Sequence, residues 1–209
     1  MNGVHRWAAA AGVAGPVGFL TATFALAGLR SDVIAAQGWV SWPSSMALGG
    51  TPGIPMIAAF LWLAVCYSTF SLGALRPGLR FRSPWIGFLG IAAGDLLLAF
   101  PTDERASPPT WHGSLHLAGV VLVTVCTLVA AIGVTVATLG MPAWRPWRLA
   151  LPVPFLATAI GAAAGFDAGW AKVTYVVGIT LPAAVVGGLL LAGTRGAPVS
   201  RTVSAARSG

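Results

Sequence analysis

The sequence predicts an all-α membrane protein: a six-transmembrane-helix bundle with both termini in the cytoplasm. Two compositional observations point to the membrane. Of the 209 residues, 56% are hydrophobic and only 8% are charged, whereas soluble domains carry about 25% charged residues. The third observation is a series of continuous apolar runs that approach the roughly 20 residues needed to cross a bilayer. These runs lack the in–out alternation of a transmembrane β-barrel.

Charged turns and proline-rich connections divide the apolar runs into six predicted spans. The spans cover approximately residues 7–29, 54–75, 84–100, 110–139, 149–165 and 172–192. The basic tail, residues 195–209, is expected to be disordered because it has little apolar surface to bury. We therefore expect one transmembrane domain, residues 1–194, followed by this tail.

The basic residues orient the predicted bundle. Only three of the twelve, Arg30, Arg105 and Lys172, fall on the side away from the termini. Cytoplasmic loops carry the excess of Lys and Arg, so both termini are predicted to be cytoplasmic. All five acidic residues then lie at or toward the outer face: Asp32, Asp95, Asp103, Glu104 and Asp167. The chain is thus expected to be a multi-pass protein of the cell membrane.

The net charge of +7 does not indicate a nucleic-acid partner. The arginines form short clusters beside apolar runs, which is the pattern that sets topology rather than the pattern that follows phosphates. The expected partner is the lipid bilayer. Cys66 and Cys126 fall within apolar runs and far from each other, so we expect free thiols that act as small hydrophobic residues.

Polar chemistry is concentrated between Asp95 and His116, around the hairpin that joins the third and fourth spans. This stretch holds three of the five acidic residues and two of the three histidines. Pro101 should end the third span, because proline cannot donate the helical hydrogen bond. Ser107 or Thr110 should cap the start of the fourth. His5, near the N-terminus, is assigned no role.

Three ionisable side chains can converge at this hairpin. His112 and His116 are four residues apart, so their imidazoles project from one helix face. In an antiparallel hairpin, Asp95 and His116 come to a similar depth inside the outer boundary. Ionisable groups within a membrane are costly, and they normally face the bundle interior and pair with one another. We therefore take Asp95, Asp103, His112 and His116 as the candidate site.

Three interpretations of this group stay open. It is a structural polar network, or a metal site, or a centre for acid–base or proton-relay chemistry without a metal. In the metal site, His112, His116 and one of Asp95 or Asp103 would bind an ion such as zinc. Asp103 and Glu104 are otherwise typical of a solvated turn.

The hairpin also resembles a known family. The segment AFPTDERASPPTWHGSLHLAG is similar to the hallmark of a bacterial and archaeal membrane family catalogued as domain of unknown function nine-nine-eight. That hallmark reads approximately F-P-T-D-P, a short loop, and T-x-H-G-x-x-H. The resemblance implies a six-helix fold and points to Asp103, His112, Gly113 and His116, with Ser45 from a second, weaker segment. Glu104 stands where the family often has proline. The resemblance implies no particular reaction.

Several functions are compatible with such a site. The first is a metal-dependent hydrolase that acts on a lipid or another hydrophobic molecule, with the metal activating water. The second is a metal-free cyclase of terpenoid type, in which Asp95 stays protonated in an apolar pocket and initiates the reaction. The third is a non-enzymatic transporter or accessory subunit. Six spans without an internal repeat offer little support for transport.

Overall fold

The computed structural model describes residues 3–29, 31, 53–78, 82–101, 110–139, 141, 144, 152–164 and 169–193. Within these residues the structure is all-α and contains no strand, and its helices form six rods. The predicted all-α class and the predicted number of helices are thereby confirmed. The predicted tail and the long connection after the first span lie outside the described residues.

The helix bounds agree with the predicted spans to within a few residues. The second rod is a continuous helix made of α3, a wider π-helical turn η3 and a short α4. The elements are α1 (Gly3–Leu29), α3 (Ile54–Phe70), η3 (Ser71–Leu75), α4 (Arg76–Gly78), α5 (Ser83–Leu98), α6 (Trp111–Thr138), α7 (Pro152–Ala163) and α8 (Gly169–Gly193).

Four of the six rods are long and apolar enough to cross a membrane. These are the segments His5–Leu29, Ile54–Leu75, Trp111–Thr138 and Trp170–Gly193. The two other rods, α5 and α7, are apolar but shorter, with 16 and 12 residues. The protein is therefore a multi-pass membrane protein by helix length and composition. That α5 and α7 also span, and that the termini are cytoplasmic, stay predictions.

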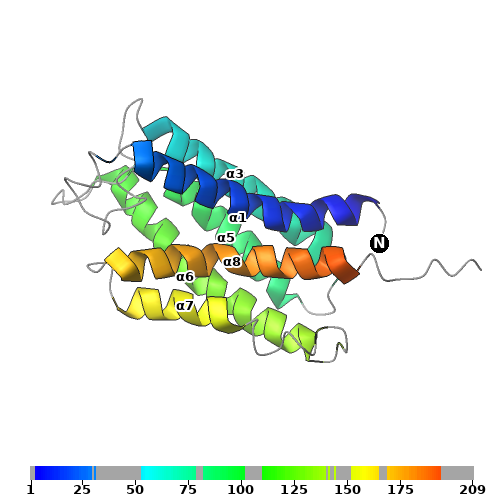
Figure 1. Ribbon diagram of the computed structural model, residues 1–209. Coiled ribbons are helices and arrows are strands. Elements are labelled where there is room, and N and C mark those ends of the chain that lie inside the picture. The colour runs from blue at the N-terminus through cyan, green and yellow to red at the C-terminus, as the bar shows by residue number, and fades with distance from the viewer. Residues whose placement is uncertain are drawn as a thin grey trace, which may run out of the picture.

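The rods form a closed ring. Neighbours around it are α1, α3, α5, α6, α7 and α8, with α8 packed back against α1. The start of α1 and the end of α8 lie at the same end of the bundle (Figure 1), which we call the terminal end. The end of α5 and the start of α6 lie at the opposite end, which we call the hairpin end. An even number of antiparallel rods produces this arrangement.

Helices α5 and α6 pack backbone against backbone. A Cβ atom added at Gly87 would lie 2.6 Å from the amide nitrogen of Ala130, and one at Gly94 would lie 2.5 Å from Cγ2 of Val123. Small residues permit this approach in membrane bundles. The glycines fix how α5 sits along α6, and therefore which polar side chains of the two helices can meet.

The π-helical turn η3 was not predicted by the sequence. Its carbonyl groups are offset from the regular helical pattern, and two side-chain hydrogen bonds stabilise this region. His5 on α1, which was assigned no role, donates from Nδ1 to the carbonyl oxygen of Gly73 at 2.9 Å. The buried hydroxyl of Ser71 donates to the carbonyl oxygen of Trp85 on α5. The turn thus ties three helices together near the terminal end.

Candidate functional site

Asp95 is the buried acid of the bundle. It lies on the inward face of α5, and its side chain is 0% exposed. Neither carboxyl oxygen has a hydrogen-bond partner among the described residues. An isolated ionised carboxylate in an apolar interior carries a very large desolvation cost, so the neutral, protonated acid is the favoured form there. The Asp95 side chain thus carries a proton inside the bundle.

Two tyrosines from other helices lie within electrostatic range of the Asp95 carboxyl. The hydroxyl of Tyr67 on α3 donates to the carbonyl oxygens of Ile179 and Thr180 on α8, at 3.2 and 3.3 Å. The hydroxyl of Tyr175 on α8 is 2.8 Å from Oγ1 of Thr124 on α6. Four helices therefore contribute to the polar interior around Asp95.

Sequence reasoning missed both tyrosines, although a signal was present. The chain has nine tryptophans but only two tyrosines. Tyrosine in membrane proteins is enriched at the interfaces, whereas Tyr67 falls in the interior of its apolar span and Tyr175, in the second turn of α8, is turned into the bundle. Their exposed fractions are 0% and 5%. A tyrosine that is buried within an apolar span indicates a polar partner inside the bundle.

A second buried polar atom lacks a partner. Oγ1 of Thr127 on α6 makes no hydrogen bond among the described residues. Other buried threonines of the bundle, such as Thr23 and Thr180, donate to the carbonyl oxygen four residues earlier. Thr127 thus provides a natural comparison for Asp95, because it is equally buried but does not carry an ionisable group.

The two hairpin histidines bind the backbone of the turn. Nδ1 of His116 lies 2.9 Å from the carbonyl oxygen of Phe100, and Nδ1 of His112 lies 3.1 Å from that of Pro101. A carbonyl oxygen can only accept, so each imidazole carries a hydrogen on Nδ1. Helix α5 ends at Leu98, earlier than Pro101, because proline also disfavours helical geometry in the preceding residue. The histidines satisfy the carbonyl groups released at this helix end.

The start of α6 supports this arrangement. Thr110 caps the helix, as one of the two predicted candidates, and its side chain accepts a hydrogen bond from the amide of Gly113 at 3.3 Å. His116 is buried, 6% exposed, and its ring meets that of Phe60 on α3 edge to face. Lys172, in the first turn of α8, lies within electrostatic range of His116.

The described residues include no group of three or more His, Cys, Asp or Glu side chains that could hold a metal ion. Asp95, His112 and His116, all of them described, therefore do not form such a group by themselves. Asp103, Glu104 and Ser45 lie outside the described residues. A metal site that combines the two histidines with Asp103 stays a prediction. Cys66 and Cys126 are free thiols, as predicted.

An apolar groove of 540 Å³ runs along α6 from the hairpin end. The residues that line it are Gly113, Ser114, Leu117, Ala118, Val121, Leu122 and Val125. With 3.6 residues per turn, these positions lie on the face opposite His116 and Val123. Thr124, which contacts Tyr175, lies between the two faces. Tyr175 therefore adjoins the flank of the groove and is also within range of Asp95.

No family model, no curated protein and no solved structure was found to match the chain.

Proposed function

We propose that the protein is a membrane-embedded enzyme in which Asp95 carries out acid–base chemistry on a hydrophobic molecule. The observation that carries this proposal is the Asp95 carboxyl group, which is fully buried and has no hydrogen-bond partner among the described residues. Ionisable residues inside a membrane domain are functional candidates by default, because inserting them is costly.

The alternative structural role for Asp95 has little support from its contacts. A structural polar group returns its desolvation cost through hydrogen bonds, and the histidines of the same hairpin do so. Asp95 forms none with the described residues. A desolvation cost that no hydrogen bond offsets is typical of functional sites. There, the rule that buried polar groups form hydrogen bonds is broken because the chemistry requires it.

The chemistry that suits a buried neutral acid is proton transfer to a weakly basic group. Asp95 would give its proton to a carbon–carbon double bond, and the cation so formed would lose a different proton back to the Asp95 carboxylate. The product is an isomer or cyclised form of the substrate, so atoms and charge balance without a second reactant. The cyclisation of a terpenoid belongs to this class.

The groove on α6 supports a substrate that enters from the bilayer. Its volume of 540 Å³ lies within the roughly 300–1,000 Å³ of small-molecule sites. Its walls are almost entirely apolar, and Leu117 and Val121 expose 64% and 57% of their surfaces. Thr124 lies beside the groove on α6, and its hydroxyl group is 2.8 Å from that of Tyr175, which is within electrostatic range of Asp95.

Asp95→Asn tests the proposal, with Thr127→Val as its matched control. Both changes preserve side-chain shape and affect an unpartnered buried group, but only the first removes an ionisable proton. Lipid-soluble extracts of cells that express each variant would be compared with those of cells lacking the protein. We expect an isomeric product with the wild type and with Thr127→Val, and none with Asp95→Asn. An identical product profile with Asp95→Asn would overturn the proposal.

A metal-dependent hydrolase is the second candidate, and the histidine geometry is the observation that favours it. Metal-binding histidines usually donate their other ring N–H to a carbonyl or carboxylate oxygen, as His112 and His116 do through Nδ1. A metal would then bind through Nε2, with Asp103 as a third ligand. Membership of the family that the hairpin resembles belongs to this proposal. Equal metal content in purified wild type and in the His112→Ala/His116→Ala variant would contradict it.

A further inference from the structure

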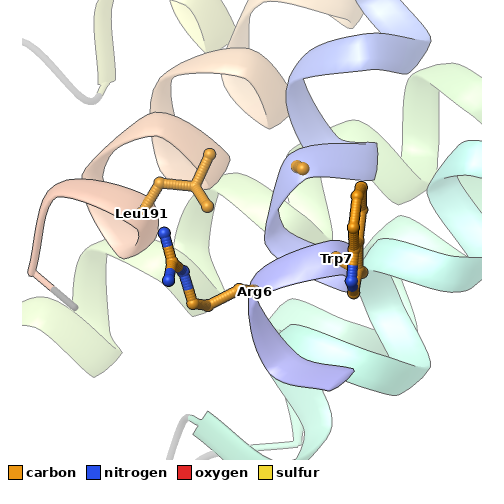
Figure 2. Close-up of a pocket in the computed structure, with 4 residues that line it drawn as sticks. Arg6, Trp7 and Leu191 are labelled. Atoms are coloured by element: carbon orange, nitrogen blue, oxygen red, sulfur yellow. The ribbon is translucent and has the colours of Figure 1, made fainter. Parts of the chain in front are cut away.

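A second cavity lies at the terminal end, far along the bundle from the hairpin. It has a volume of 330 Å³ and is lined by Arg6, Trp7, Ala10 and Leu191. The first three residues belong to the first turns of α1, and the fourth belongs to the last turns of α8. Figure 2 shows the Arg6 side chain extending from α1 toward Leu191, with Trp7 beside it on the same helix. The cavity is therefore an opening between the two helices that carry the chain termini.

The two helices meet directly next to this opening. A Cβ atom added at Gly187 on α8 would lie 2.7 Å from the carbonyl oxygen of Ala9 on α1. This contact lies one helical turn from Leu191, toward the middle of the bundle. The cavity is consequently a notch that opens at the terminal end and is closed toward the interior. Its walls are apolar except for the guanidinium of Arg6.

Arg6 has no acidic partner among the described residues. Asp95 is the only acid that the structure describes, and it belongs to the hairpin half of α5. Arg76 at the same end behaves differently, because its guanidinium lies over the ring of Trp85, 5.7 Å from the ring centre. The Arg6 guanidinium is thus available for an anion.

We propose that this notch binds an anionic phospholipid, with the headgroup phosphate on Arg6 and the start of an acyl chain between α1 and α8. Guanidinium groups form strong charge-assisted hydrogen bonds with phosphate oxygens. Exposed tryptophans such as Trp7, 78% exposed, sit at headgroup level in membrane proteins. The predicted cytoplasmic side is also the side where anionic lipids attract basic residues.

The chemistry of the lining selects a lipid over a soluble anion. A free phosphate would gain only one guanidinium at this site, and it would leave the apolar surface of Ala10 and Leu191 uncovered. A phospholipid covers that surface with its chain and also satisfies the charge. Binding therefore requires both the phosphate and the acyl chain. A substitution in the protein can remove the contact with either one separately.

Lipid adducts on the delipidated full-length protein can be counted by native mass spectrometry. The protein would be titrated with phosphatidylglycerol or phosphatidylcholine. Arg6→Gln removes the charge, and Arg82→Gln removes an exposed charge at the start of α5, outside the notch. We expect the wild type and Arg82→Gln to bind one phosphatidylglycerol more tightly than phosphatidylcholine. For Arg6→Gln we expect phosphatidylglycerol binding to weaken by about fivefold or more, since one cation near an anionic surface contributes about that much.

A second pair of variants tests the apolar half of the site. Ala10→Leu would fill the notch, whereas Ala25→Leu adds the same bulk at an exposed position near the other end of α1. We expect only Ala10→Leu to abolish the preferential adduct. Equal losses for Arg6→Gln and Arg82→Gln would overturn the proposal, because lipid binding would then reflect overall charge. Displacement of the lipid by inorganic phosphate would overturn it as well, in favour of a soluble-anion site.

Discussion

Asp95 and His116 lie on adjacent helices of one hairpin, and both are almost completely buried, yet their polar atoms have opposite surroundings. His116 donates to a carbonyl oxygen at the end of α5 and packs edge to face on Phe60. Asp95 lies a turn deeper on α5 and has no hydrogen-bond partner among the described residues. Within one hairpin, therefore, one buried polar side chain stabilises the fold and another weakens it.

The difference shows that proximity of polar residues in a sequence does not make them one site. In the sequence, the stretch from Asp95 to His116 contains most of the polar chemistry. In the structure, the histidines belong to the turn and Asp95 belongs to the bundle interior with Tyr67 and Tyr175. The four predictions below test this separation, and each uses thermal unfolding in detergent unless stated otherwise.

The largest effect is expected from Gly87→Leu, which disturbs the helix pair on which both environments depend. Any Cβ atom at Gly87 meets the backbone of Ala130, which cannot move aside. Overpacking of this kind costs about 3 kcal/mol or more when the neighbour is backbone. The matched control is Gly28→Leu, because nothing lies within 4 Å of a Cβ atom at Gly28. Similar losses of stability in both variants would contradict the proposed backbone contact.

His116→Ala is expected to destabilise the protein by about 3 kcal/mol. The substitution removes a buried ring and leaves the carbonyl oxygen of Phe100 without its donor. His116→Asn retains a donor but shortens its reach, and it should recover only part of the loss. Unchanged unfolding of His116→Ala would show that the hairpin does not need this hydrogen bond.

Asp95→Leu is expected to act in the opposite direction and raise the stability by about 2 kcal/mol. Replacing an unpartnered buried polar group by an apolar side chain of similar size removes a desolvation cost of that order. The same reasoning predicts a smaller gain for Thr127→Val. A large loss of stability in Asp95→Leu would instead indicate a partner for the carboxyl group beyond the described residues.

The smallest effect is expected from His112→Ala, a loss of about 1 kcal/mol. His112 makes the same kind of backbone hydrogen bond as His116, at 3.1 Å, but its side chain is only half-buried. One hydrogen bond near the surface contributes about that amount. Protease cleavage after Pro101 provides a second measurement. Equal effects of the two histidine substitutions would contradict the ranking by burial.

Much of the fold could be predicted because it depends on composition and spacing. The apolar runs placed six helices correctly, and Thr110 was one of two predicted caps for α6. The end of α5 was placed two residues too late, since the effect of proline on the preceding residue shortens the helix further. The π-helical turn at Ser71–Leu75 was not predictable, because a shift in hydrogen-bond register leaves no mark on hydrophobic periodicity.

The site was predicted less completely. The spacing of His112 and His116 predicted that both imidazoles project from one helix face, but it could not show that backbone carbonyl oxygens would be their partners. The similar depth of Asp95 and His116 in the membrane suggested that Asp95 would lie beside the two histidines. Its carboxyl group instead lies within electrostatic range of Tyr67 and Tyr175, which come from helices that are distant in sequence. Contacts between helices depend on rotation about each helix axis, and the composition of an apolar span hardly constrains that rotation.

The short length of α5 has a consequence for the surrounding bilayer. Its 16 residues extend about 24 Å, which is less than the roughly 30 Å hydrocarbon thickness of a typical membrane. Its neighbour α6, with 28 residues, extends about 42 Å. If α5 crosses the bilayer as predicted, the lipid next to it must become thinner, or its headgroups must dip toward the hairpin. The acyl-chain length of the host membrane should therefore change how far water reaches toward Phe100 and His116.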